Sequence, residues 1–499
     1  MKGEGIVDID RILKLEGKYN LYEDTIEGIH YWMYGRGELC NFILPRIENP
    51  EVGKAHNQLK SKTSFLGKVW GLLYNSIWNG KRKAFQAEVC IIDHERRIWE
   101  NNEYECKYTK EIYEHYKDKA IILERPYNYG HLKPIGKEKV AYLDYISLLC
   151  NFHYLFVKTF RKRKYRKICN EIERHMRDPL KELNQEIGIH YSMAELQAYL
   201  SKVILRNQVR IREMERLLDK IQPRIIIEVV GWSNTCMAAN ETAKRRKIIT
   251  YEMQHGVSGH TDYEYNYQTK KILPQLPSYF LTFGDYVEGN IRFPVEKEVR
   301  SVGFPYLERK VMKRREAKKE KDIKTVLFLS SGQIGEHFSQ LACRLAELTE
   351  TEQKCNVIYK LHPGEYVAWE QRYPRLLELE REGKIRVIDS SDSDLYQLFD
   401  EADVQVAGTP TTSICEGLAF GLVTLVYDFY DLTKISFLFE EGFAQKISDT
   451  SDIQPILDAV TGSTGKKEEN WRKMWKGNAM KNIVNVIEKT SGVKGMSNY

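Results

Sequence analysis

Residues 404–426 (VQVAGTPTTSICEGLAFGLVTLV) combine residue types that could bind an anion. An apolar strand leads into a loop with Thr411, Thr412 and Ser413, and a helix carrying Glu416 follows. The free N–H groups and the dipole of a helix N-terminus attract anions, and hydroxyls add donors for phosphate oxygens. Glu416, about one helical turn further on, could accept hydrogen bonds from a sugar diol. The segment predicts a phosphate site, although an ordinary strand–helix unit with a Ser/Thr N-cap has the same pattern.

A second chemical signal is the histidine in VIYKLHPGE, residues 357–365. The first residues read as a strand, and His362, Pro363 and Gly364 form the turn after it. In an open parallel sheet, ligands bind beyond the carboxyl ends of the strands. His362 is therefore expected at the same sheet edge as the 409–413 loop, where it could donate to a phosphate or protonate a leaving group. A structural histidine at a strand end is the other interpretation.

A second histidine, His255, follows the predicted strand 247–251 (KIITY). An imidazole at that edge could take the proton of a hydroxyl or steady a departing phosphate. Gly256 is expected to let the backbone turn tightly, and Glu252 to orient the ring. A buried structural histidine at a domain edge is the alternative. If His255 is not the catalytic group, the base is to be sought among Glu228, Asp262 and Glu264.

The composition is that of a multidomain protein with reduced thiols. The 499 residues suggest two or three domains of roughly 150 residues each, and 42% hydrophobic residues can build full-sized cores. No apolar signal-peptide core opens the sequence, and no stretch reaches the roughly 18 apolar residues of a membrane span. Nine scattered cysteines form no CxxC pair, which argues against a zinc site and favours the cytoplasm.

The net charge of +6 is concentrated in two basic runs. The run 309–324 is expected to be a solvated helix face or linker. The run 158–167 contains Phe160 and Tyr165, so weak contact with an anionic membrane surface stands beside a solvated face as its interpretation. Neither run is accompanied by an RNA-binding signature or a zinc finger, and nucleic acid is not an expected partner.

The last third of the chain alternates strands with helical patterns, which predicts a doubly wound parallel sheet. A loop with Ser331 and Gly332 follows its first strand. The expected strands are 324–329, 357–361, 385–388, 404–407 and 422–426. Expected helices span 334–350, 366–380 and 393–399, and one more begins at Ser413.

A second α/β unit precedes it. Its expected strands are 88–92, 119–123, 224–230, 247–251, 279–283 and 299–302, and Trp232 lies in the loop after the third of these. A largely helical insertion is expected over 140–220. The predicted division is an α/β domain at 1–305, a charged linker at 306–323, an α/β domain at 324–465 and a C-terminal segment at 466–499, whose helix (471–487) packs back on the first domain.

Two such domains place the carboxyl edges of their sheets across a shared central cleft, a common location for ligand pockets. This α/β arrangement of two Rossmann-like domains resembles the GT-B fold of nucleotide-sugar glycosyltransferases. Leu361-His362-Pro363 with the later Thr411-Thr412-Ser413 is similar to paired donor-binding motifs of capsule sialic-acid and Kdo transferases. Gln254-His255-Gly256 resembles the His-Gly motif of capsule enzymes and teichoic-acid polyol-phosphate polymerases, in which that histidine is proposed to be catalytic.

The resemblance implies a metal-independent glycosyltransferase of capsule, lipopolysaccharide or exopolysaccharide assembly, without a cofactor. Its partners would be a nucleotide-sugar donor and a glycan or lipid-linked glycan acceptor, in the cytoplasm or at the inner face of the membrane. His255 would be catalytic, and Gln254, Gly256 and Trp232 would lie on the acceptor side. The donor side would comprise His362, Pro363, Gly364, Thr411, Thr412, Ser413, Glu416, Ser331 and Gly332.

Several departures keep alternatives open. The acidic-acidic-Gly motif of many bacterial sialyltransferases is missing from the first domain; Glu440-Glu441-Gly442 lies after the donor motifs. Asp392 and Asp394 read as a helix N-cap pair rather than a metal motif, and no P-loop is present. The alternatives are a CDP-polyol phosphotransferase, a sugar-nucleotide 2-epimerase, disfavoured because the loop lacks Ser-Gly-Gly, and a non-catalytic polysaccharide-binding subunit.

Overall fold

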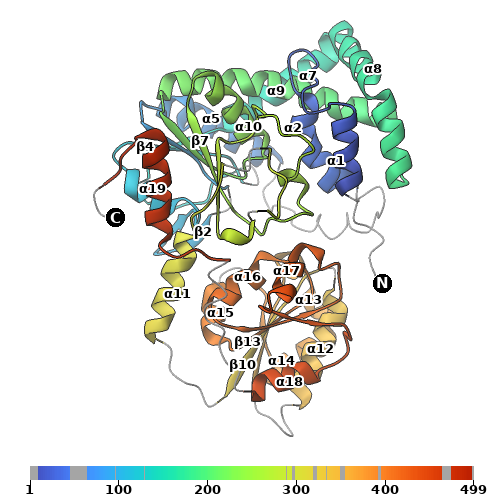
Figure 1. Cartoon of the computed structure of the whole chain (residues 1–499), viewed down its shortest axis with the longest axis vertical. Helices are drawn as coiled ribbons and strands as arrows, with labels where there is room; N and C mark the ends of the chain where they lie inside the picture. The colour runs from blue at the N-terminus through green and yellow to red at the C-terminus, as the bar shows by residue number, and fades with distance from the viewer. Residues whose placement is uncertain are drawn as a thin grey trace.

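The structure, a computed structural model, is built around two parallel sheets (Figure 1). A small antiparallel hairpin, β2 (Ile98–Glu100) and β3 (Glu103–Glu105), stands apart from both. The described residues are 9–44, 65–95, 97–127, 130–136, 138–287, 289–294, 298–317, 323–332, 334–348, 355–390, 395–462 and 474–496.

The first sheet has the strand order β5-β4-β1-β6-β7-β8-β9, and every neighbouring pair is parallel. Its central strands β1 and β6 are almost continuous apolar runs because helices cover both faces of the sheet. Their bounds are β1 Val89–Ile92, β4 Ala120–Glu124, β5 Val140–Tyr142, β6 Ile225–Val229, β7 Ile249–Met253, β8 Tyr279–Thr282 and β9 Val299–Ser301.

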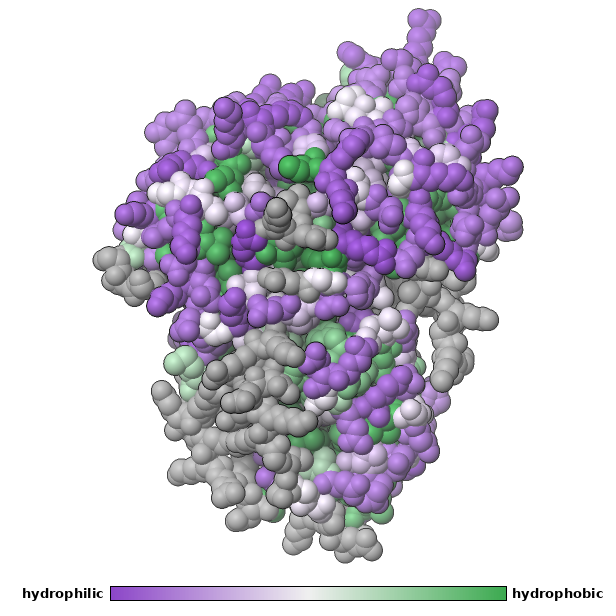
Figure 2. All heavy atoms as spheres, in the orientation of Figure 1, coloured by the Kyte–Doolittle hydropathy of each residue, from purple (hydrophilic) through white to green (hydrophobic). Residues whose placement is uncertain are grey.

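The helices of this half include three long ones in the expected insertion: α7 (Asp144–Phe160), α8 (Lys162–Ile187) and α9 (Met193–Ile221). Figure 1 shows them at the upper end of the molecule, and Figure 2 shows a mostly hydrophilic surface where α8 lies. The others are α1 Ile9–Lys18, α2 Tyr31–Glu38, α5 Phe65–Trp78, α6 Lys110–Tyr116 and α10 Asn234–Arg245.

The second sheet has the order β12-β11-β10-β13-β14-β15 and is also parallel throughout. Its strands are β10 Lys324–Leu329, β11 Cys355–Lys360, β12 Arg386–Ile388, β13 Val404–Ala407, β14 Val423–Tyr427 and β15 Gln445–Ile447. Its helices are α12 Gly335–Leu348, α13 Trp369–Arg372, α14 Pro374–Arg381, α15 Leu395–Glu401, α16 Thr412–Ala419, α17 Ser436–Glu440 and α18 Gln454–Thr461.

Two segments join the halves. The expected charged linker begins as a helix, α11 (Pro305–Ala317), in which Leu307 and Val311 are buried. After the second sheet the chain returns, and α19 (Ala479–Ser491) packs its apolar face on the first half (Figure 1). The expected start of that last helix, residues 471–473, lies outside the described residues.

Numbered in order of appearance, the strands of the second sheet run 3-2-1-4-5-6, and those of the first sheet begin in the same way. This is the order of doubly wound, Rossmann-type sheets, and it confirms the predicted fold class. The expected helix over 366–380 is in fact two helices, because Pro374 cannot continue the first. Strand β7 runs two residues further than expected, so Glu252 lies inside the sheet.

Candidate functional site

The strand order places two pairs of loops at the points where ligands of such sheets bind. In the second sheet these are the loops after β10 and β13, and in the first sheet the loops after β1 and β6. Helices α16 and α17 lie on the side of the lower half that faces the upper half (Figure 1). The two carboxyl edges therefore approach each other.

The hydroxyl loop and the histidine loop meet directly. Thr412 Oγ1 accepts a hydrogen bond of 3.2 Å from the backbone N of Val257, two residues after His255. Thr411 is the N-cap of α16 in an extended conformation, and its side chain makes no capping hydrogen bond. Ser413 is half-buried in the first turn. The structure thus brings the His255 loop to the N-terminus of α16.

His362 stands exposed after β11. Its Nδ1 accepts from Gly364 N at 3.1 Å, so in the neutral ring the proton sits on Nε2, which can donate. Pro363 and Gly364 open a short 3-10 helix. Because β10 lies between β11 and β13, His362 is two strand spacings, about 10 Å, from the Thr411 loop.

Glu365, for which the sequence predicted no role, connects the His362 loop to the loop after β10. Its buried carboxylate accepts from Ser330 Oγ at 3.1 Å, Tyr373 OH at 2.7 Å and His362 N at 2.8 Å. Gly332 lies over the same side chain, where an added Cβ would touch Glu365 Cγ at 3.6 Å. Half-buried Ser331 lies in this loop. The spacing of a glutamate three residues after the N-cap is the capping-box signal that could have found it.

Glu416 is buried at the boundary between the halves. Its Oε1 is 3.1 Å from Nζ of Lys107, which comes from the first half. Burial works against the charge of Lys107, but Glu416 outweighs it and the pKa of Lys107 is raised. The predicted ribose contact remains a prediction, and Lys107 already bonds one oxygen of that carboxylate.

His255 lies among aromatic rings at the end of β7. Its carbonyl accepts from Tyr108 OH at 2.8 Å, its Nδ1 is 3.5 Å from Tyr265 OH, and its ring centroid is 6.1 Å from that of His94. Burial, followed by the charge of His94, lowers the pKa of His255 to about 3. The ring is therefore neutral at physiological pH and able to accept a proton.

Tyr265 links His255 to a buried carboxyl group. Tyr265 OH donates to Glu252 Oε1 at 2.8 Å, and Gly231 N donates to the same atom at 2.8 Å. Burial raises the pKa of Glu252 to about 7. Its register partner on β6, Glu228, accepts from Asn240 Nδ2 at 2.7 Å, and burial and the charge of Glu252 raise its pKa to about 8. Glu252 thus reaches His255 through Tyr265.

The proposed acceptor-side residues have different surroundings. Gln254 is buried, with Nε2 donating to Gly256 O at 2.6 Å and to Tyr286 OH at 2.9 Å, while its Oε1 accepts from Phe283 N at 2.7 Å. Gly256 does not have a positive φ, so its backbone conformation is one that other residues can also adopt. Trp232 packs half-buried against the core of the first half.

Of the three alternative bases, Asp262 and Glu264 make structural contacts. Asp262 accepts from Lys434 Nζ at 2.5 Å across the boundary and from Gly259 N at 2.8 Å, and Glu264 accepts from Asn41. Burial raises the pKa of both groups. Asp392 and Asp394 lie outside the described residues.

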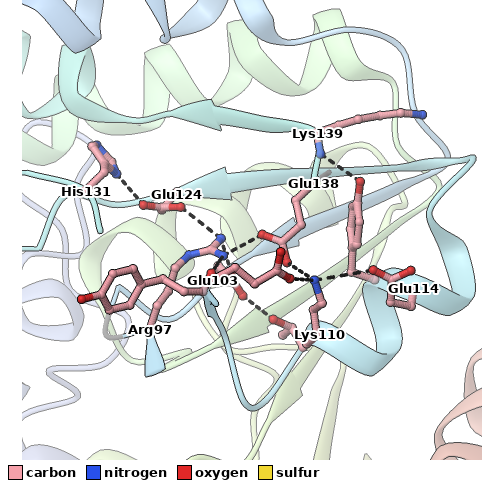
Figure 3. A network of polar contacts seen from close by, with 12 residues as sticks. Arg97, Glu103, Lys110, Glu114, Glu124, His131, Glu138 and Lys139 are labelled. Atoms are coloured by element: carbon pink, nitrogen blue, oxygen red, sulfur yellow. Dashed lines mark hydrogen bonds and ion pairs between the residues drawn. The ribbon is translucent and has the colours of Figure 1, made fainter. Parts of the chain in front are cut away.

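A buried ionic network braces the loops after β1 and β4 (Figure 3). Nη2 of Arg97 is 2.8 Å from Asp93 and 3.0 Å from Glu124, and its Nη1 is 2.6 Å from Glu138. His94 follows Asp93 directly, so the network fixes the loop that carries the second histidine of the site. His94 follows the predicted strand 88–92 by two residues, so the position after a strand that pointed to His255 also points to His94.

The chain matches no family model, and no curated protein matches it. It is similar to several solved structures. A UDP-GlcNAc 2-epimerase from Methanocaldococcus jannaschii is 15% identical over 57% of this chain and 82% of that chain, with a TM-score of 0.42. A putative UDP-N-acetylglucosamine 2-epimerase from Listeria monocytogenes is 11% identical over 82% of this chain and 98% of that chain (TM-score 0.46).

The wall teichoic acid polymerase TagF is 9% identical over 85% of this chain and 93% of that chain, with a TM-score of 0.42. At these values the fold assignment rests on the strand order of the two sheets themselves. The chain is a two-sheet, Rossmann-type α/β protein, and its chemistry has to be argued from its own site.

Proposed function

We propose that this protein is a glycosyltransferase that moves a sugar from a nucleotide-sugar donor to a growing surface glycan. The observation that carries the proposal is the hydrogen bond from Val257 N to Thr412 Oγ1. It brings a neutral, half-buried histidine from one Rossmann-type sheet to the helix N-terminus of the other. A proton acceptor beside a phosphate site is what transfer from a nucleotide sugar requires.

The donor's phosphates would lie at the N-terminus of α16. Helix N–H groups and the hydroxyls of Thr411 and Ser413 would neutralise the leaving phosphate, with His362 Nε2 as a further donor. This set needs no cation, which supports metal-independent transfer. Pro363, Gly364, Ser331 and Gly332 complete the proposed donor side by shaping the loops around it.

His255 is the proposed catalytic base toward the acceptor hydroxyl. In the free protein its pKa of about 3 makes it a weak base. A donor that brings negative charge nearby would raise that pKa toward neutrality, which is where general bases work best. Tyr265 and Glu252 would hold the ring in place. The proposed acceptor is a glycan or lipid-linked glycan of capsule, lipopolysaccharide or exopolysaccharide, and the proposed location is the cytoplasm.

Ligand-induced stabilisation tests the donor site. Thermal shift against CMP-, CDP-, UDP- and GDP-sugars should show one preferred nucleotide. Thr411→Ala and His362→Ala should each weaken its binding by about 1–3 kcal/mol, the usual loss for hydrogen bonds to charged groups. Thr461→Ala, on α18 away from this edge, is the matched control. A nucleotide that binds equally well to both site variants would contradict the proposed site, and a preference for CDP-polyols would favour the phosphotransferase alternative.

A further inference from the structure

Helix α5 carries an apolar face that points into solvent. Its exposed large side chains recur at helical spacing, with Trp70 71% exposed and Trp78 58% exposed. Leu73, Tyr74 and Ile77 lie on the same face. The opposite side of the helix faces α7, where Asn75 Nδ2 donates a hydrogen bond to Asp144 Oδ1 at 3.3 Å. A helix of a soluble protein normally turns its apolar face toward the core. The exposed apolar face of α5 therefore indicates a binding partner.

The neighbouring helix repeats the pattern. Helix α7 packs alongside α5, and its Phe152 is 69% exposed and its Phe160 76% exposed. Phe156 lies between them, with ring centroids 6.2 Å from Phe152 and 5.7 Å from Phe160. Leu149 and Leu155 are exposed as well. Two adjacent helices thus present aromatic rows to solvent.

Positive charge borders the aromatic row of α7. Arg161, Lys162, Arg163 and Arg166 follow Phe160 and are exposed, and the guanidinium of Arg161 lies 5.7 Å from the Phe156 ring centre. The sequence from 145 to 170 contains no Asp or Glu. Glu27 pairs with Lys164 and Lys167, which leaves the cations nearest the rings for other partners. Apolar rings beside such a run of cations match the chemistry of an anionic bilayer, in which acyl chains lie under negative headgroups.

We infer that the exposed faces of α5 and α7, with the basic start of α8, form a docking surface for an anionic lipid membrane. No described helix has the length and apolar content to span a bilayer. The rings would lie at the level of the headgroups and the cations would pair with lipid phosphates. The surface belongs to the end of the molecule that lies away from the second sheet (Figure 1), so docking leaves the α16 edge uncovered. The inference does not depend on the proposed function.

Vesicle co-sedimentation of the full chain tests this surface. Binding should be strong to phosphatidylcholine vesicles that contain phosphatidylglycerol, weaker to phosphatidylcholine alone, and reduced by salt. Phe152→Ser/Phe160→Ser should lower partitioning at least about tenfold, since each ring loses apolar burial. The control is Ile272→Ser/Val367→Ser, which removes two comparably exposed apolar side chains elsewhere and should leave partitioning unchanged.

A second pair of variants tests the charge. Arg161→Gln/Lys162→Gln/Arg163→Gln should lower binding to anionic vesicles by about tenfold or more. Lys270→Gln/Lys481→Gln/Lys489→Gln removes the same charge from exposed positions elsewhere and should change binding little. Equal losses in the test and control variants, or no vesicle binding, would overturn the inference. So would a vesicle-free dimer that Phe152→Ser/Phe160→Ser dissociates, because a second copy would then cover the surface.

Discussion

At the scale of single residues, the site depends on how burial sets protonation. His255 is kept neutral, whereas the carboxyl groups of Glu252 and Glu228 are held near the point of protonation. Both shifts have the same cause, since the interior disfavours the charged form of either group. Tyr265, between Glu252 and His255, connects the two.

The first prediction concerns the protonation of His255. A folded pKa of about 3, against 6.5 for an ordinary histidine, means that its ring stays neutral as the pH falls through 6.5. This favours the folded state above pH 6.5, and the benefit is lost as the pH falls toward 3. In NMR titrations, the imidazole signal that disappears in His255→Ala should not move near neutral pH in the ligand-free protein. A midpoint near 6.5 would contradict the burial described here.

Glu228 gives a prediction of opposite sign. Its folded pKa is about 8 against an ordinary 4.5, so its contribution to stability is complete below pH 4.5 and is lost as the pH rises through 8. Glu228→Gln keeps the neutral shape. Between about pH 5 and about pH 9, the melting temperature of Glu228→Gln should fall less than that of the wild type. The wild type should lose about 2–4 kcal/mol more free energy of unfolding over this range. If the melting temperatures of the two proteins change with pH by the same amount, Glu228 is not protonated in the folded protein.

At this scale, a residue could be predicted where its neighbours in the sequence form a recognisable strand. His255 and His362 were recognised because they follow predicted strands within a few residues, although β7 lies two residues later than predicted. The partners of these residues were not predicted. Tyr265 and Lys107 reach the site from segments without a strand signal, and only the fold brings Lys107 to Glu416.

At the scale of elements, the glycines at the strand ends differ in the space available for a side chain. A Cβ on Gly231 would overlap the carboxylate of Glu252 and lie 3.0 Å from Glu228 Oε1. On Gly256 it would meet only Thr412 Oγ1, at 3.5 Å, which is ordinary contact. Gly231→Ala should therefore lower stability by about 1–3 kcal/mol, and Gly256→Ala should not. Thermal unfolding of both variants measures this, and equal losses would mean that the packing at β6 is not as described.

The elements themselves were largely predictable. Strands β10 and β13 match the expected ranges because buried parallel strands are short apolar runs bounded by loops. The first 80 residues gave no such pattern, and α1 and α2 owe their place to contacts with α8 and α9. Strand β15 was missed because two of its three residues are exposed and polar.

At the scale of the whole molecule, the two halves meet through polar and apolar contacts at the proposed site. Lys107–Glu416 and Lys434–Asp262 join them at 3.1 and 2.5 Å, and Tyr286 stacks on Phe437 with ring centroids 5.0 Å apart. A donor at α16 would therefore be contacted from both halves. Since helix N–H groups and hydroxyls would stabilise the leaving phosphate without a cation, turnover should survive EDTA. Strict dependence on Mg²⁺ or Mn²⁺ would contradict the proposal and make Asp392 and Asp394 ligand candidates.

The most direct test is nucleotide release from the preferred nucleotide sugar in the presence of a glycan acceptor. For His255→Ala we expect turnover about 10²–10⁴ lower, with donor affinity and melting temperature nearly unchanged. His190→Ala, at an exposed position on the first half, serves as the control and should turn over normally. A folded His255→Ala protein that binds the donor and releases nucleotide at the wild-type rate would contradict the central claim that this histidine takes the acceptor's proton.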